Sequence, residues 1–226
     1  MKKKLRILIV DDHPMIVEAY KNLLSSSDLS DYRFLIDTAN DIDTAIKKIV
    51  RSVGENTPYN LLFFDVKLPP SSDGEIISGE GLAVFAREKL PFAKIVILTM
   101  FNETFRIHNI LKTVNPDGLL IKNDLTSKEF LIAFNAIMYS PPYYSATVVN
   151  YFRNQSLNSE GVVLDDINRK IIFYLSKGIK TKNLPNYINL SLSAIEKLKN
   201  QIRNLLKLDE ANDETIIEEA QKRGFV

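Results

Sequence analysis

Five side chains whose chemistry suits phosphoryl transfer stand at corresponding places along the sequence. They are Asp11, Asp12, Asp65, Thr99 and Lys122. Each follows or closes a short apolar run of the kind that forms a buried strand of a parallel sheet. Because ligands of open α/β sheets bind at the carboxyl ends of the strands, we expect these side chains to meet at one edge.

Three carboxylates that meet repel one another unless a cation lies among them, and hard oxygen ligands suit Mg²⁺. The sequence therefore predicts a magnesium site formed by Asp11, Asp12 and Asp65. At such a site Asp65 can act as a carboxylate nucleophile towards phosphorus and become an aspartyl phosphate. Lys122 and the hydroxyl of Thr99 can bind the oxygens of the phosphoryl group.

Each of these residues alone has an ordinary structural explanation. An aspartate at a strand end is more often a helix cap, a threonine is common in strands, and a lysine is common in loops. The phosphoryl-transfer interpretation depends on finding all five groups at the ends of the expected strands. His13 has the chemistry of a general base, but its position indicates a residue at a helix start, and we assign it no chemistry.

The apolar runs alternate with segments that have helix signals. The runs are 5–10, 34–36, 61–64, 95–98 and 119–121. Pro14 can begin the first helix, and Thr126 with Glu129 forms a capping box before an amphipathic stripe. This alternation predicts an α/β fold, a (βα)5 doubly wound parallel sheet of the flavodoxin-like order 2-1-3-4-5, followed by a small all-α domain.

Composition places limits on the class of protein. The chain has 226 residues, of which 45% are hydrophobic and 25% charged, and it has no cysteine. These values are typical of a globular protein and exclude disulfides and thiolate chemistry. The apolar run near the N-terminus is too short for a signal peptide or a membrane span. We therefore expect a cytoplasmic protein with no membrane partner.

The first part of the chain resembles the receiver domain of two-component response regulators over about residues 5–140. The motifs that carry the resemblance are ILIVDDHP (7–14), LLFFDVKLP (61–69), IVILTM (95–100) and GLLIKND (118–124). The resemblance implies that Asp65 is the phosphoacceptor and that a sensor histidine kinase donates the phosphoryl group. It also implies that the backbone carbonyl of Lys67 joins the three aspartates as a ligand of Mg²⁺.

The second part has a different organisation. Residues 1–140 are the predicted receiver domain, residues 141–160 a linker with a short helix, and residues 161–226 a helical domain. Helices are predicted near 166–177, 181–188, 192–208 and 213–223. Although the formal net charge is +1, residues 177–207 hold seven basic residues and one acid. This local excess of positive charge favours one anionic partner.

Residues 164–208 resemble the LuxR-type helix-turn-helix of the NarL/FixJ family, which implies binding to double-stranded DNA. In the predicted helix 192–208, apolar residues share one face, and polar residues suited to base edges and phosphates occupy the other. The candidate DNA contacts are Lys197, Lys199, Asn200, Arg203, Asn204 and Lys207. Relatives pair through the final helix, so we expect a homodimer that uses Ile216, Ile217 and Ala220.

Together these features predict a DNA-binding transcriptional regulator that is controlled by phosphorylation and is not an enzyme. Two alternatives stay open at this stage. In the first, the C-terminal domain contacts a protein in place of DNA, which the acid Glu196 and the near-neutral total charge favour. In the second, the chain is a phosphatase with Asp65 as its nucleophile. Haloacid-dehalogenase-type phosphatases have an aspartate two residues after the nucleophile, where this chain has Lys67.

Overall fold

The structure is a computed structural model. It describes residues 3–26, 31–100, 104–155, 164–208, 212–223 and 225. The chain forms two compact units: residues 1–100 with 114–154, and residues 101–113 with 155–226. Residues 156–160 of the predicted linker lie outside the described residues.

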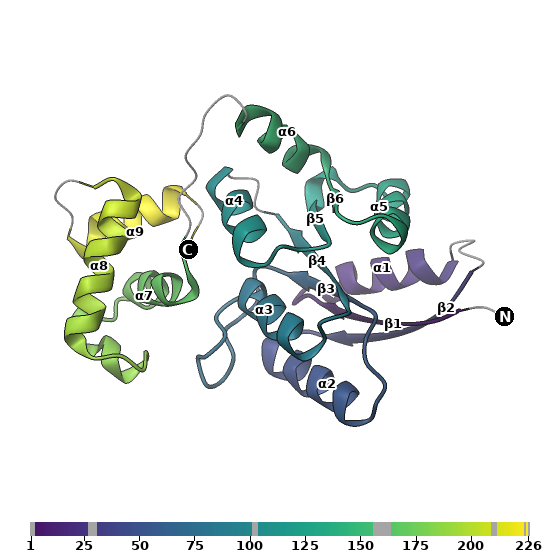
Figure 1. Cartoon of the computed structure of the whole chain (residues 1–226), viewed down its shortest axis with the longest axis horizontal. Helices are drawn as coiled ribbons and strands as arrows, with labels where there is room; N and C mark the ends of the chain where they lie inside the picture. Colours follow the sequence, from purple (N-terminus) through teal and green to yellow (C-terminus); the bar gives the residue numbers. More distant parts are fainter. Residues whose placement is uncertain are drawn as a thin grey trace. The chain divides into compact units, whose positions relative to one another are not determined.

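The first unit is built on a parallel β-sheet (Figure 1). Its strands in the described residues are β1 (Lys3–Val10), β2 (Tyr32–Ala39), β3 (Leu61–Asp65), β4 (Lys94–Thr99), β5 (Gly118–Ile121) and β6 (Tyr143–Tyr144). Their order is β2-β1-β3-β4-β5-β6. The predicted α/β fold and the order of its first five strands are thus confirmed. β6 was not predicted, because a pair of tyrosines is too short to show a strand pattern.

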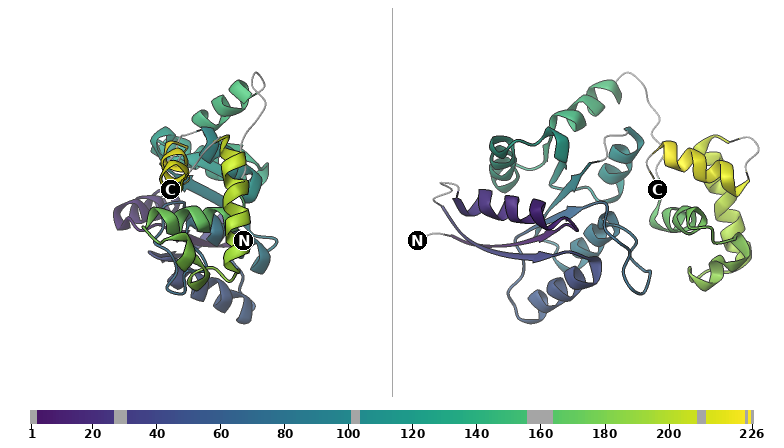
Figure 2. Two further views of the ribbon diagram at one scale, coloured as in Figure 1. Left: turned by 90° about the vertical axis from the view of Figure 1, so that its left-hand side faces the viewer. Right: turned by 180° about the vertical axis from the view of Figure 1, so that it is seen from behind.

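Helices cover both faces of this sheet (Figures 1 and 2). α1 (Pro14–Ser26) and α5 (Ser127–Tyr139) lie on one face, and α2 (Ile42–Gly54) and α3 (Gly79–Lys89) lie on the other. Alternate strand residues, such as Leu5, Ile7 and Ile9 of β1, share a core cluster with side chains of α1 and α5. The residues between them face the opposite side of the sheet, so the strands are apolar on both faces. α6 (Ala146–Gln155) follows β6.

The local signals at the helix ends act as the sequence predicts. Pro14 is the first residue of α1. The Thr126 side chain accepts a hydrogen bond from the backbone N–H of Glu129, and the Glu129 carboxylate accepts one from the backbone N–H of Thr126. This capping box fixes the start of α5 immediately after the 3-10 turn η1 (Lys122–Asp124), which carries Lys122 out of the sheet.

The second unit is helical in its described residues. Its elements are α4 (Thr104–Thr113), α7 (Asp166–Ser176), the 3-10 helix η2 (Thr181–Asn186), α8 (Leu192–Leu206) and α9 (Asp213–Lys222). Three of the four helices predicted in this part are confirmed. The predicted helix at 181–188 is instead 3-10, and it contains Pro185, which cannot donate a backbone hydrogen bond.

The apolar side of α9 lies inside its own domain. Ile216 and Ala220 are fully buried, in one core cluster with Ile195 and Ile202 of α8. Ile217 is partly buried against the same cluster. The sequence led us to expect these residues at a dimer interface, but Ile216 and Ala220 are instead buried within their own domain. Ile216 and Ala220 cover α7 and α8 and are not available at the surface for dimerisation.

Candidate functional site

Strand register brings the predicted acidic residues together. β1 and β3 are neighbours, and Val10 of β1 is aligned with Phe64 of β3. Asp11, which follows β1, and Asp65, the last residue of β3, therefore lie side by side at the carboxyl ends of these strands. On the next pair of strands, Thr99 of β4 is aligned with Ile121 of β5, so that Lys122 follows at the same edge. All five predicted groups thus lie at the carboxyl edge of the sheet.

Lys122 joins two of the carboxylates. Its Nζ atom lies 2.6 Å from Oδ2 of Asp11 and 3.2 Å from Oδ1 of Asp65. These side chains are almost inaccessible to solvent, with 6% of Lys122, none of Asp11 and 4% of Asp65 exposed. The Asp12 side chain is more accessible, with 34% of it exposed to solvent. Ligand atoms of Asp11, Asp12, His13 and Asp65 all lie within 4.8 Å of one another.

The electrostatics of the site favour a bound cation. Burial raises the pKa of Asp65, and the negative charges of Asp11 and Asp12 raise it further, while Lys122 acts in the opposite direction. One ammonium group thus faces three carboxylates. Oxygen ligands with this excess of negative charge match what Mg²⁺ requires, so the donor set fits the metal that the sequence indicated.

Thr99 and Lys67 occupy the remaining predicted positions. Thr99 is the last residue of β4 and is 1% exposed. Lys67 lies two residues beyond Asp65, and its side chain is exposed. The segment that follows is tied to α2, since the backbone N–H of Ser72 donates to the carboxylate of Asp43. Within this segment the Ser71 hydroxyl donates to Asp73 and to the backbone oxygen of Ile76.

Two further residues at this edge, Gly79 and His13, were not predicted from the sequence to belong to the site. Gly79 begins α3 directly against the backbone carbonyl of Asp65. The Nδ1 atom of His13 lies 2.7 Å from Oδ1 of Asp12 and 3.1 Å from Oδ1 of Asp11. The sequence placed His13 only at a helix start.

The predicted DNA-facing helix α8 is amphipathic as expected. Ser191 caps it by accepting from the backbone N–H of Ala194. Its inward face contributes Ile195, Ile202 and Leu206 to the core. Of the predicted contact residues, Lys197, Asn200, Asn204 and Lys207 are exposed, and Arg203 is half-buried with Nη1 donating to Asn200.

Lys199 differs from the other predicted contact residues. Its Nζ pairs with the carboxylate of Asp213 at the start of α9 and donates to the hydroxyl of Thr181 at 2.7 Å. Only 18% of its side chain is exposed. Lys199 therefore joins η2, α8 and α9, and the structure does not place it with the outward-facing basic residues.

Helix α4 makes two buried contacts within the second unit. Nη1 of Arg106 donates to the backbone oxygen of Phe225 at 3.1 Å. Oδ1 of Asn109 accepts from the backbone N–H of Leu164, also at 3.1 Å. α4 is thus hydrogen-bonded to Leu164 and to Phe225, the first and last described residues after the linker. These contacts have no sequence signal, because the paired residues lie far apart in the chain.

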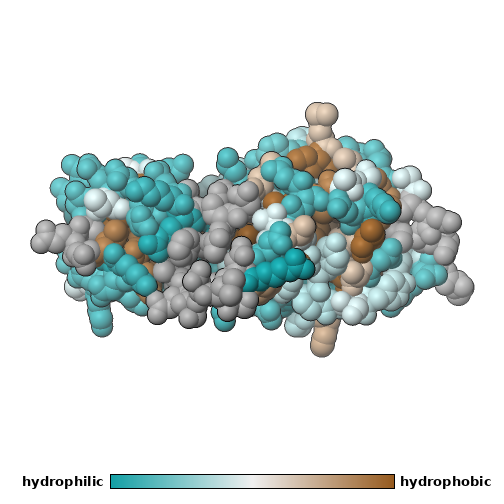
Figure 3. Space-filling view, turned by 90° about the horizontal axis from the view of Figure 1, so that it is seen from above, coloured by the Kyte–Doolittle hydropathy of each residue, from teal (hydrophilic) through white to brown (hydrophobic). Residues whose placement is uncertain are grey.

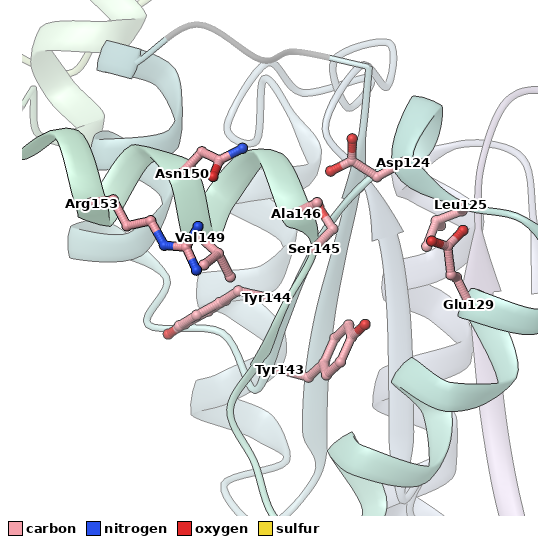
Figure 4. A pocket seen from close by; sticks show the side chains of 10 residues that line it. All are labelled: Asp124, Leu125, Glu129, Tyr143, Tyr144, Ser145, Ala146, Val149, Asn150 and Arg153. Atoms are coloured by element: carbon pink, nitrogen blue, oxygen red, sulfur yellow. The ribbon is translucent and has the colours of Figure 1, made fainter.

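The first unit also has a polar pocket away from the acidic site, between α5, β6 and α6 (Figure 4). Asp124 and Glu129 line one side of this pocket, and Arg153 projects towards it from α6. Asp124 accepts hydrogen bonds from the backbone N–H and the hydroxyl of Thr147, at 2.9 and 2.8 Å. It thereby joins η1 to the start of α6. None of the residues predicted for phosphoryl transfer lies in this pocket.

Hydrophilic side chains predominate on the face drawn in Figure 3, with hydrophobic ones in small patches. No helix within the described residues is long and apolar enough to cross a membrane.

A parallel sheet of this order, an acidic cluster at its carboxyl edge and a C-terminal helical domain are the features that the resemblance to response regulators implies. The chain is 24% identical to the oxygen regulatory protein NreC of Staphylococcus epidermidis over 98% of this chain and 99% of NreC. It is 20% identical to the transcriptional regulatory protein MctR of Rhizobium johnstonii over 91% and 88% of the two chains. No protein-family model matches the chain.

Solved structures show the same architecture. RcsB, a response regulator of Salmonella typhimurium, is similar with a TM-score of 0.66 and 17% identity over 98% of each chain. RcsB bound to promoter rprA in the presence of the phosphomimetic BeF3⁻ gives a TM-score of 0.67 at 16% identity, over 97% of this chain and 99% of that one. The resemblance to response regulators that the sequence indicated is thus confirmed.

Proposed function

We propose that this protein is a response regulator that accepts a phosphoryl group on Asp65 from a sensor histidine kinase and controls transcription by binding DNA. One observation carries the first half of this proposal. Lys122 lies within contact distance of Asp65 and Asp11, in a cluster of carboxylates at the edge of the sheet. This is the arrangement that phosphoryl transfer to a carboxylate requires.

Each residue has a part in the proposed transfer. Asp11, Asp12, Asp65 and the backbone carbonyl of Lys67 would hold Mg²⁺, which supplies positive charge at the phosphoryl oxygens. Lys122 supplies a second positive charge, and the Thr99 hydroxyl can donate a hydrogen bond to the phosphoryl group. Oδ1 or Oδ2 of Asp65 attacks phosphorus, and the donor takes the electron pair of the bond that breaks.

The exposed polar side of α8 supports the second half of the proposal. Lys197, Lys207 and Arg203 provide positive charge for phosphates, while Asn200 and Asn204 can read base edges. RcsB is described in complex with promoter DNA, and one of its structures has two RcsB dimers on two parallel DNAs. We extend both DNA binding and dimerisation to this chain.

We also propose the domain division 1–140, 141–160 and 161–226, with the receiver first and the DNA-binding domain last. Helix α4 would carry the signal between them. It follows Thr99 closely in the chain, and Arg106 and Asn109 attach it to Phe225 and Leu164. Phosphorylation that moves Thr99 would therefore act on a helix that holds the DNA-binding domain. A coupling of about 1–3 kcal/mol is enough to change DNA affinity usefully.

The first test is labelling with acetyl phosphate and Mg²⁺. We expect one phosphoryl group per chain by intact-mass measurement, none in Asp65→Asn, and full labelling in the exposed control Glu88→Gln. Labelling of Asp65→Asn to the same extent as the wild type would rule out Asp65 as the acceptor. Sustained release of inorganic phosphate from small phosphate esters would instead support the phosphatase alternative.

The second test is selection of genomic DNA fragments by the wild-type protein, with and without phosphorylation. We expect enrichment of a small set of fragments with repeated half-sites, and a change in their affinity on phosphorylation. Failure to retain DNA even at low salt would favour the alternative in which the C-terminal domain contacts a protein.

A further inference from the structure

His13 lies among the carboxylates of the proposed metal site in a constrained position. Its backbone N–H donates to Oδ1 of Asp11 at 3.0 Å, which fixes the turn that follows β1. In this turn Nδ1 of the imidazole faces the same oxygen of Asp11 at 3.1 Å and Oδ1 of Asp12 at 2.7 Å. The side chain is 60% exposed, so it can adjust without disturbing the core.

The spacing of these atoms is that of neighbouring ligands around one ion. Nitrogen and oxygen ligands lie roughly 2.1 Å from a small divalent metal, and two of them at a right angle are then about 3 Å apart. The separations from Nδ1 to the two carboxylates, 2.7 and 3.1 Å, lie on either side of this value. A metal bound by Asp11 and Asp12 would therefore have the imidazole nitrogen within reach.

We infer that His13 is a direct nitrogen ligand of this site, which makes the site bind a borderline transition-metal ion such as Co²⁺ or Ni²⁺ more tightly than Mg²⁺. Imidazole is a good ligand for borderline metals and a poor one for Mg²⁺, which prefers oxygen. This inference rests on the proposed function, because it assumes that the aspartates hold a divalent ion. It extends the proposed function by naming the metal ions that the site prefers and the residue that causes this preference.

The chain offers a direct spectroscopic test, because it has two histidines, His13 and His108. Pulsed electron paramagnetic resonance of the full-length protein with Mn²⁺ detects the nuclear modulation of a coordinated ¹⁴N nucleus. We expect this signal in the wild type and in His108→Ala, and its loss in His13→Ala. A wild-type protein that binds Mn²⁺ without nitrogen modulation, or a signal that persists in His13→Ala, would overturn the inference.

A second variant separates ligation from simple hydrogen bonding. His13→Gln keeps an amide N–H that can donate to Asp12 but has no aromatic nitrogen. We expect calorimetric titration to show Co²⁺ affinity at least about tenfold lower in both His13→Gln and His13→Ala, and Mg²⁺ affinity changed less than twofold. Equal losses for the two metals, or full Co²⁺ affinity in His13→Gln, would contradict a nitrogen ligand.

Acetyl-phosphate labelling of the same variants keeps the two proposals distinct. If the wild type and the control His108→Ala are both labelled with Mg²⁺, the phosphoacceptor function stands, and the nitrogen signal then decides the role of His13. If the wild type is labelled neither with Mg²⁺ nor with Mn²⁺, the proposed function fails. The Mn²⁺ spectrum then still shows whether His13 binds the ion.

Discussion

Gly79 lies so close to the backbone carbonyl of Asp65 that a Cβ atom on Gly79 would be 1.7 Å from the carbonyl oxygen. The backbone N–H of Gly79 also donates to the oxygen of Val66, the next residue, at 3.0 Å. The first turn of α3 thus fixes the backbone of the proposed phosphoacceptor, and only a residue without a side chain fits there.

The first prediction follows from this contact. Gly79→Ala must displace either α3 or Asp65, so we expect it to lower the free energy of unfolding by ~1–3 kcal/mol and to slow labelling of Asp65 by acetyl phosphate. Urea denaturation measures the first effect. Gly54→Ala is the matched control, because nothing lies within 4 Å of its added Cβ. It should stabilise slightly, and a Gly79→Ala protein as stable as this control would contradict the argument.

The second prediction concerns the charge balance of the acidic site. Lys122→Met leaves the buried carboxylates of Asp11 and Asp65 without their ammonium partner, so the metal-free protein should lose ~3 kcal/mol of stability. Asp65→Asn should instead stabilise the metal-free protein, because it removes a buried charge that two neighbouring aspartates repel. Thermal unfolding in EDTA compares the two. Shifts of the same sign would show that the site is not dominated by excess negative charge.

The third prediction concerns acid stability. The pKa of Asp124 is lowered in the folded protein: burial alone would raise it, but hydrogen bonds from Ser145 and Thr147 have the larger combined effect. Asp124 therefore stabilises the fold above its unfolded pKa of 3.8, and this contribution disappears as the pH falls through the lower folded value. Asp124→Asn should cost about 1 kcal/mol at neutral pH, since hydrogen bonds to a charged acceptor are stronger.

Chemical denaturation of the Asp124→Asn variant at several pH values tests this sign. The difference from the wild type should shrink as the solution becomes more acidic than pH 3.8. The exposed Glu88→Gln variant provides the control. A difference that stays constant or grows in acid would mean that the carboxylate charge is not what stabilises the start of α6.

The fourth prediction distinguishes two lysines of α8 that the sequence treated alike. Lys197→Ala should weaken DNA binding and reduce the slope of log affinity against log salt by about one, as expected for one lost phosphate contact. Lys199→Ala should leave the slope unchanged and lower the melting temperature, because Lys199 pairs with Asp213 and Thr181. Fluorescence anisotropy over a range of salt concentrations measures the slopes. A reduced slope in Lys199→Ala would show that Lys199 contacts a DNA phosphate, as the sequence predicted.

The sequence alone was sufficient to locate the first five strands and the acidic residues at their ends. Both depend on local patterns. An apolar run of strand length shows where a buried strand lies, and the first polar residue after it shows where the strand leaves the core. Because parallel strands all end at the same edge, Asp11, Asp65 and Lys122 had to approach one another once the order was known.

The tertiary structure decided the features that depend on a distant neighbour. Lys197 and Lys199 lie about 200° apart around α8. Lys199 therefore borders the buried face of the helix, and the tertiary structure brings Asp213 there to pair with it. From the sequence, the apolar stripe of Ile216 and Ala220 could face a partner or its own domain. In the structure both residues pack in one core cluster with residues of α8, so they face the interior of their own domain. Local sequence determines which side chains avoid water, but the three-dimensional path of the chain determines what they meet.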